Sequence, residues 1–309
     1  GQGGLSLRAA VWLPTAQAGS FPHLLQNLEA SGFGCRLEDF HAAVFAVPGP
    51  VKDPSYAAMA NIPWVIDLNQ AQGLLGAART FLINDFAAQA YACLTEAVKD
   101  AVLLHPGTAE DKSLLSIIGA GTGLGHCSLT PDGRGGYLAL PSEAGHAAFP
   151  FLTDREQEYQ RFLLQETGQP FATGDLVVSG TGLSRLHRFL TGKNLSPPEV
   201  AGVLTPRAET TIWFARFYAR ACRNFALTLL PLAGLYISGG LAIHNRFLVQ
   251  NEHFLEEFSH CPHYGELLRS IPLFLNINEE IGLWGAAFYG LGSISGLSLG
   301  DGNHSGKSA

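Results

Sequence analysis

The chain has 309 residues, of which 47% are hydrophobic and only 15% are charged, and its formal net charge is −7. A chain this long and this apolar can bury a sizeable core, which excludes extensive disorder, and its length indicates about two domains. The acidic balance and the lack of a Lys/Arg cluster exclude the electrostatic footprint of a nucleic-acid-binding protein.

The most apolar segment, residues 225–237, is shorter than the ~20 residues that a membrane-spanning helix needs, and Pro231 and Gly234 interrupt it. We therefore expect a core helix that ends before a buried strand. The N-terminal residues show no basic region followed by an apolar stretch, so we expect no signal peptide. These features predict a soluble, cytoplasmic protein with no membrane partner.

The cysteines are scattered, odd in number and form no C-x-x-C pair: Cys35, Cys93, Cys127, Cys222 and Cys261. This pattern favours the reduced thiols of a cytoplasmic protein over a disulfide framework. It also argues against a structural zinc site, so we expect no structural metal.

Stretches with strand character alternate with helical periodicity along the chain, which favours a layered α/β fold. In chain order we expect a strand at 7–13, a helix at 22–31, strands at 42–47 and 64–66, a helix at 68–75, a strand at 80–83, a helix at 86–99, strands at 114–118, 126–130 and 137–140, helices at 155–166, 183–190 and 208–230, a strand at 235–237 with a helix after it to 258, a strand at 273–275 and a helix at 282–289. The Gly- and Ser-rich tail is expected to be disordered.

The strongest functional signal is the sequence GAGTGLG, which directly follows an apolar strand. Without Cβ atoms, several backbone N–H groups of such a turn can point at one anion, and a threonine adds a hydroxyl donor. No Gly-Lys-Ser/Thr follows, so it is not a Walker A loop, and the strand after it makes it a poor Rossmann fingerprint. We expect a strand–turn–strand phosphate loop; an ordinary flexible hairpin is the alternative. Its candidate residues are Gly119, Gly121, Thr122, Gly123 and Gly125.

A second glycine segment, Ser238-Gly239-Gly240, lies where a strand meets a helix. A helix N-terminus there can receive an anion, or a nucleotide can lie on the bare backbone. The related segment at 177–183 is weaker and is equally explained as a helix entry capped by Ser179 or Thr181.

Two polar pairs are candidates for the chemistry. Asn84-Asp85 ends a strand, and a carboxylate beside an amide suits proton abstraction from an alcohol. Its alternative reading is that Asp85 is the N-cap of the next helix. Glu143 and His146 lie three residues apart in a Gly-containing loop and suit hydrogen bonding to a polyol; a surface loop with no role is the alternative. Because this pair has no second cluster beside it, zinc ligation is disfavoured.

Together these segments resemble the bacterial glucokinase family, within the hexokinase/actin-like ATPase superfamily. The matching segments, in the family's order, are FLINDF at 81–86, GAGTGLG at 119–125, LPSEAGH at 140–146, LVVSGTGL at 176–183, YISGG at 236–240 and GLWGAA at 282–287. Their order and spacing hold from about residue 7 to residue 292.

The resemblance implies two unequal α/β domains of RNase H-like topology with an interdomain cleft. The small domain would comprise residues 1–95 and 279–296, the large domain residues 96–278, and the disordered tail residues 297–309. Asp85 would be the general base on the 6-hydroxyl of the sugar, and the two glycine segments would hold the nucleotide. The residues implied to bind glucose hydroxyls are Asn61, Asn84, Glu143, His146 and Asp175, the last of which replaces the family's usual Glu.

One part of the family pattern is missing. The family begins with a strand, a D-x-G-G-T-N turn that carries an Asp linked to magnesium, and a second strand. Here Gly3-Gly4 lacks the Asp and the Thr, and residues 7–13 look like the family's third strand. We therefore expect an upstream segment to be missing, and we expect such a chain to bind glucose yet phosphorylate it poorly.

The resemblance predicts phosphorylation of glucose to glucose 6-phosphate with ATP and Mg²⁺, a phosphoryl transfer that needs positioning and charge stabilisation from the protein. Two alternatives remain open. One is a non-catalytic or truncated sugar-binding or regulatory relative, and the other is a kinase for another hexose, such as mannose, fructose or an amino sugar. A homodimer is implied by the resemblance alone.

Overall fold

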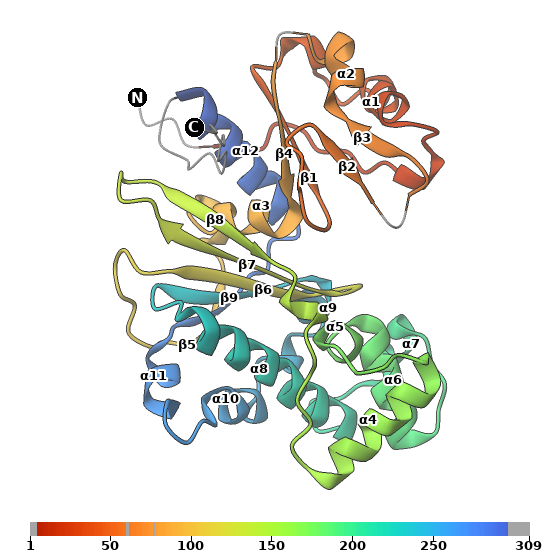
Figure 1. Cartoon of the computed structure of the whole chain (residues 1–309), viewed down its shortest axis with the longest axis vertical. Coiled ribbons are helices and arrows are strands. Elements are labelled where there is room, and N and C mark those ends of the chain that lie inside the picture. The colour runs from red at the N-terminus through yellow and green to blue at the C-terminus, as the bar shows by residue number, and fades with distance from the viewer. Residues whose placement is uncertain (1–4, 60–61, 77, 296–309) are drawn as a thin grey trace, which may run out of the picture. The chain divides into compact units, whose positions relative to one another are not determined.

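The computed structural model describes residues 5–59, 62–76 and 78–295 and shows a mixed α/β protein (Figure 1). The chain divides into two compact units. Unit 1 comprises residues 1–99, 129–141 and 280–309, and unit 2 comprises residues 100–128 and 142–279. The sequence-based boundaries differ from these chiefly at residues 129–141, which the sequence analysis assigned to the large domain. The expected tail at 297–309 lies outside the described residues.

Unit 1 is formed by short strands and by helices that cover them. Its elements are η1 Thr15–Gln17, α1 Phe21–Ala30, η2 Leu37–Asp39, β1 Ala42–Val47, β2 Tyr56–Ala58, β3 Val65–Asp67, α2 Leu68–Leu75, β4 Arg79–Asn84, α3 Asp85–Ala92, η3 Glu96–Val98 and α12 Ile281–Ser295, with most of β8 Tyr137–Ser142. Strands β1 and β4 pair in parallel with Val47 opposite Asn84, and β2 pairs with β3 antiparallel. The parallel register places the carboxyl end of β4 at Asn84.

Helices α3 and α12 pack so closely that a glycine is required between them. A Cβ at Gly285 of α12 would collide with the carbonyl of Ala88 on α3. The hydroxyl of Tyr91 on α3 accepts a hydrogen bond from Ala139 N at 3.2 Å. These contacts hold α3, and with it the segment that starts at Asn84, within unit 1.

Unit 2 contains most of the larger sheet and most of the helices. Its elements are β5 Val102–His105, β6 Leu115–Ala120, the first part of β7 Leu124–Pro131, η4 Ala144–His146, α4 Asp154–Thr167, α5 Gly174–Val177, α6 Gly180–Thr191, α7 Pro197–Val203, α8 Glu209–Leu229, β9 Gly234–Ser238, α9 Gly240–His244, η5 Arg246–Leu248, α10 Glu252–Ser259, α11 Gly265–Ser270 and β10 Leu273–Leu275. The strand order of the sheet is β5-β10-β9-β6-β7-β8. Strands β6, β9 and β10 are mutually parallel, so their carboxyl ends lie at one edge.

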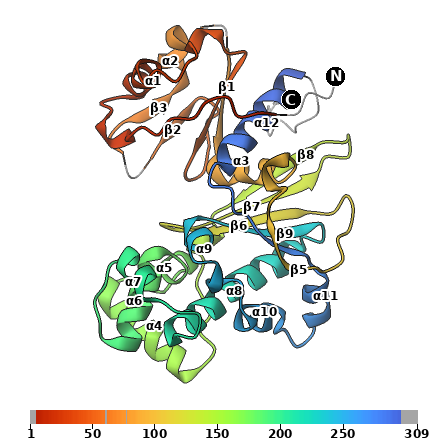
Figure 2. The ribbon, with the colours of Figure 1, turned by 180° about the vertical axis from the view of Figure 1, so that it is seen from behind.

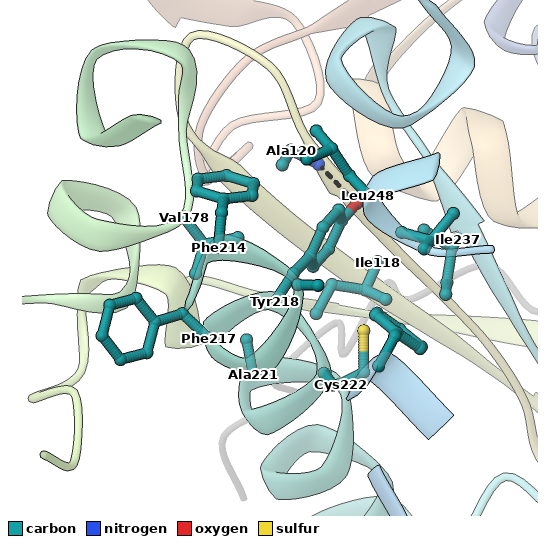
Figure 3. Packing of buried hydrophobic residues seen from close by; sticks show 14 of the residues in the cluster. Ile118, Ala120, Val178, Phe214, Phe217, Tyr218, Ala221, Cys222, Ile237 and Leu248 are labelled. Atoms are coloured by element: carbon teal, nitrogen blue, oxygen red, sulfur yellow. Dashed lines mark hydrogen bonds between the residues drawn. The ribbon is translucent and has the colours of Figure 1, made fainter. Parts of the chain in front are cut away.

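Helix α8 lies between this sheet and α10 (Figures 1 and 2). All six residues of β6 are buried, as expected for an inner strand that is covered on both faces. Phe214, Tyr218 and Cys222 of α8 pack in one buried cluster with Ile118 and Ile237 (Figure 3). The apolar segment at 225–237 is therefore a core helix end followed by a buried strand, as predicted. Among the described residues, no helix has the length and apolar character that a membrane crossing requires.

Three sequence-based element predictions are wrong. Residues 7–13 form no strand, and no strand of the described residues pairs with them. A strand needs such a partner for its backbone hydrogen bonds. The helix expected at 86–99 ends at Ala92, and a separate 3₁₀ turn capped by Thr95 follows it. The helix expected to reach 258 is three pieces, because Asn245 ends α9 and begins η5, and Asn251 caps the start of α10.

Burial of a histidine in the sheet makes unit 2 sensitive to acid. His126 of β7 packs edge-on against Phe225, with ring centroids 4.7 Å apart, and its Nδ1 has no hydrogen-bond partner within the described chain. Burial lowers the pKa of His126 from 6.5 to about 4. Because the unfolded chain binds this proton more tightly, stability present above pH 6.5 is lost as the pH falls towards 4.

We expect this loss to reach roughly 3 kcal/mol, since each pKa unit corresponds to ~1.4 kcal/mol. Urea unfolding at pH 7.0 and pH 4.5, compared between the wild type and His126→Phe, measures it: the variant should lose about 2 kcal/mol less stability on acidification. His244→Gln is the control, because the side chain of His244 is 64% exposed. Equal losses in the wild type and in His126→Phe would contradict the prediction.

Candidate functional site

The predicted phosphate loop joins β6 to β7 in unit 2. The turn itself comprises Gly121, Thr122 and Gly123, and Gly121 N donates to Gly123 O at 2.8 Å. Gly119 and Gly125, which the sequence analysis placed in the turn, lie inside β6 and β7 instead. The strand–turn–strand arrangement is confirmed, but the turn is tighter than predicted.

Three hydrogen bonds from residues that are distant in the sequence fix the turn and the residues on either side of it. Ala120 N donates to the hydroxyl of Tyr218 at 3.1 Å, and Leu124 N donates to Oδ1 of Asp175 at 2.7 Å. Gly180 N, at the start of α6, donates to Gly121 O at 2.9 Å. A turn with these three anchors is not the freely flexible hairpin that the alternative reading describes.

These anchors also decide which amides of the loop remain available. The N–H groups of Ala120, Gly121 and Leu124 are already used, whereas those of Thr122 and Gly123 donate to no atom in the described part of the chain. Thr122 is exposed, and a Cβ at Gly121 would meet nothing within 4 Å. The donors that this loop can offer an anion are therefore two amides and the Thr122 hydroxyl.

The second glycine segment lies directly beside the loop. In the parallel pairing of β6 with β9, Gly119 is opposite Ser238, so the chain turns at Gly239 next to Ala120. Gly239 has a φ of +90°, and a Cβ on it would collide with the backbone of Ala120. Only glycine satisfies both demands, and it brings the two backbones into contact at the carboxyl ends of neighbouring strands.

Two buried polar residues that the sequence analysis did not single out support this segment. The hydroxyl of Tyr218 accepts from Ala120 N, as Figure 3 shows, and it also donates to Ser238 O at 3.1 Å. Asn276 is fully buried at the end of β10, and its Nδ2 donates to Oγ of Ser238 at 3.2 Å. Helical periodicity marks Tyr218 only as core, but a polar residue directly after the apolar strand 273–275 was a readable signal for Asn276.

Glu143 and His146 belong to the same part of unit 2. Their 3₁₀ turn is pressed against the start of β7, since a Cβ at Gly145 would collide with Leu124 O. The side chains of Glu143 and His146 are 49% and 67% exposed, and Oε2 and Nε2 are 3.9 Å apart. Both therefore keep hydrogen-bonding capacity for a ligand hydroxyl.

Asp175 is in the first turn of the short helix α5 and contacts the phosphate loop. Its Oδ1 accepts from Leu124 N, and a Cβ at Gly123 would collide with the same oxygen. The side chain of Asp175, which is shorter than the Glu that the family usually has here, thus contacts the loop itself. Gly123 is glycine because the carboxylate of Asp175 takes the space that a side chain would need.

In unit 1, Asn84 and Asp85 lie where β4 meets α3. Asn84 is the N-cap: its Oδ1 accepts from Ala87 N at 3.0 Å, and its Nδ2 donates to Gly49 O at 3.0 Å. The alternative reading of Asp85 as the N-cap is therefore wrong, since Asp85 is the first helical residue. Oδ1 of Asp85 accepts from Phe86 N at 2.9 Å and from Asn84 Nδ2 at 3.2 Å, and these bonds orient the carboxylate.

The remaining predicted site residue, Asn61, lies outside the described residues. Within the described chain, no group of three or more His, Cys, Asp and Glu side chains is arranged to hold a metal ion. None of the five cysteines forms a disulfide bond in the described part of the chain. Ser179 caps α6 by accepting from Gly182 N at 3.2 Å, as one reading of the segment at 177–183 proposed.

Comparison with known proteins shows the family of this chain. A family model for glucokinase matches residues 6–292. The chain belongs to the glucokinase family. Glucokinases of Nostoc sp. strain PCC 7120 and of Nostoc punctiforme are 31% and 32% identical to it over 303 and 276 residues. The first alignment covers 88% of each chain, and the second covers 79% of this chain and 80% of the relative.

Solved structures show the same architecture for this glucokinase family member. A glucokinase from an Antarctic psychrotroph superposes with a TM-score of 0.74 at 26% identity and covers 89% of this chain and 87% of its own. A glucokinase from Balamuthia mandrillaris, solved in complex with glucose, has a TM-score of 0.73 at 17% identity over 87% of this chain and 82% of its own, a likeness of fold alone. The α/β fold of the actin-like ATPase superfamily and the kinase class, both predicted above, are confirmed.

Proposed function

We propose that this member of the glucokinase family transfers the γ-phosphoryl group of ATP to the 6-hydroxyl of glucose. The observation that carries the proposal is the pair of glycine segments at the ends of β6 and β9, whose backbones touch at Ala120 and Gly239. This pair supports a nucleotide site, because the free amides of Thr122 and Gly123 suit phosphate oxygens and Gly239-Gly240 offers bare backbone.

Mg²⁺ is proposed to accompany ATP on its phosphates, where it neutralises the charge that develops during transfer. The chain's own part in phosphate binding is to orient the terminal phosphates through the loop amides. Those amides are held in place before binding by Tyr218, Asp175 and Gly180, so little reorganisation accompanies the reaction.

Glucose is proposed to be held by Glu143 and His146, with Asn61 and Asn84 as further ligands. The exposed carboxylate and imidazole of the first pair can accept from and donate to neighbouring hydroxyls of a pyranose. Asn84 keeps one acceptor lone pair on Oδ1 beyond the cap bond to Ala87 N. Asp175, tied to the loop through Oδ1, is proposed to offer its second oxygen to the sugar.

Asp85 is proposed as the general base. Its carboxylate, oriented by Phe86 N and Asn84 Nδ2, would accept the proton of the 6-hydroxyl as the oxygen attacks the γ-phosphorus and the bond to the β-γ bridging oxygen breaks. ADP and glucose 6-phosphate leave.

The proposed location is the cytoplasm, where ATP and reduced thiols are found. The proposed assembly is a homodimer, which sedimentation analysis tests.

A coupled assay for glucose 6-phosphate tests the activity. The chain, supplied with ATP and Mg²⁺, should form glucose 6-phosphate from glucose. Its kcat/KM for glucose should be at least ~10-fold higher than for mannose, fructose or glucosamine, because each of these three sugars lacks or misplaces one hydroxyl contact. Polyphosphate as the donor serves as the comparison for ATP. Absence of product with glucose and ATP, or a clear preference for another hexose, would overturn the assignment.

A further inference from the structure

The hydroxyl of Tyr218 joins two segments that are remote in the sequence. It accepts from Ala120 N at 3.1 Å (Figure 3) and donates to Ser238 O, also at 3.1 Å, and its side chain is fully buried. Burial raises the pKa of Tyr218 far above its usual value, so the phenol stays protonated and keeps its donor. Both hydrogen-bonding directions of the hydroxyl are thus used on the backbones that flank the two glycine segments.

The two hydrogen bonds of the Tyr218 hydroxyl lie at the end of the pairing between β6 and β9. The last registered pair between β6 and β9 is Gly119 with Ser238, and beyond it the two chains turn into the phosphate loop and into Gly239-Gly240. Strand pairing therefore fixes the two segments only as far as Gly119 and Ser238. Tyr218 and the contact of Gly239 on Ala120 continue the connection past the last pair.

Another buried tyrosine in unit 2 shows that this bridge is more than the usual satisfaction of a buried phenol. The hydroxyl of Tyr159 donates to one carbonyl, that of Gly182, at 3.3 Å. A single acceptor satisfies a buried phenol. Tyr218 instead projects from a helix that is fixed two residues later by the buried ion pairs of Arg220 with Glu156 and Glu257, so its hydroxyl sits on a rigid support.

We propose that Tyr218 is a positioning residue that sets the separation between the phosphate loop and the Gly239-Gly240 segment for a nucleoside triphosphate that spans both. The inference rests on the nucleotide site of the proposed function. A ligand that touches both segments depends on their separation, whereas a ligand that touches one of them does not. Loss of the Tyr218 hydrogen bonds should therefore lower the affinity for ATP and leave the affinity for ligands that touch only one segment unchanged.

The variant Tyr218→Phe removes the hydroxyl and keeps the ring. Calorimetric titration of the chain with ATP and Mg²⁺ should show at least a ~10-fold higher Kd than in the wild type, whereas the Kd values of AMP and of glucose should stay within about 2-fold. Tyr159→Phe is the matched control, since it removes a buried hydroxyl from the same unit and should leave all three Kd values unchanged.

The outcomes separate the two proposals. A wild type that binds neither ATP nor AMP overturns the proposed function. A wild type that binds ATP, together with a Tyr218→Phe variant that binds ATP equally well or loses ATP and AMP affinity in proportion, overturns the role of Tyr218 alone.

Hydrogen exchange of the wild type adds a test that needs no variant. Inorganic triphosphate, which has no nucleoside, should slow amide exchange in the phosphate loop and also in the segment from Ser238 to Gly240, because Tyr218 ties them together. Protection confined to the phosphate loop would contradict the coupling.

Discussion

Replacing Asp85 by asparagine should lower kcat for glucose phosphorylation by at least ~100-fold and leave the fold intact. The amide keeps the size of the carboxylate, and its Oδ1 can still accept from Phe86 N at the start of α3. What the variant loses is the capacity to take up the proton of the 6-hydroxyl. The coupled assay gives kcat, and calorimetry should show a Kd for glucose within about 3-fold of the wild type.

Asp67→Asn is the matched control for this variant. Asp67 is also an aspartate where a strand of unit 1 meets a helix, and its Oδ1 accepts from Asn69 N at 3.0 Å. It has no proposed role in catalysis, so its loss should leave kcat unchanged. Near-normal turnover of Asp85→Asn would remove Asp85 from its role as the base.

The second large effect is on stability, and it concerns the buried charges beside Tyr218. Arg220 donates through Nη1 and Nη2 to both carboxylate oxygens of Glu156, at 2.7 and 3.0 Å, and through Nε to Glu257 at 2.9 Å. Burial by itself raises the pKa of Glu156, but the hydrogen bonds from Arg220 and Leu152 outweigh it, so the net pKa is lowered. The pair is thus ionised at neutral pH.

We expect Arg220→Met to lower the free energy of unfolding by about 3–5 kcal/mol, because it leaves the carboxylate of Glu156 buried without its partner. Urea unfolding at pH 7 measures the loss. The control is Arg155→Met, which breaks an exposed pair with Glu209 and should cost less than ~1 kcal/mol. Adding Glu156→Gln to Arg220→Met should recover part of the loss; a double variant no more stable than Arg220→Met would contradict the electrostatic explanation.

Local patterns in the sequence predict the elements that carry the candidate site. Apolar runs identify β1, α2 and β10 with the observed bounds, and glycine spacing after an apolar strand identifies the phosphate loop. The same reasoning fails at residues 86–99, where apolar spacing continues past Ala92 although the helix ends there. Periodicity records which side chains are apolar, but the cap at Thr95 decides where the backbone turns.

By itself, then, the amino-acid order determined which residue types are available for the proposed phosphate binding, sugar binding and proton transfer, and in which order of strands and turns they occur. Only the tertiary structure decided which loop amides remain free and what holds them. The partners of Ala120 and Leu124 are 98 and 51 positions away, on helices whose own patterns indicate only burial. Hydrogen bonds between distant segments depend on how helices pack against the sheet, and no local spacing in the chain encodes that geometry.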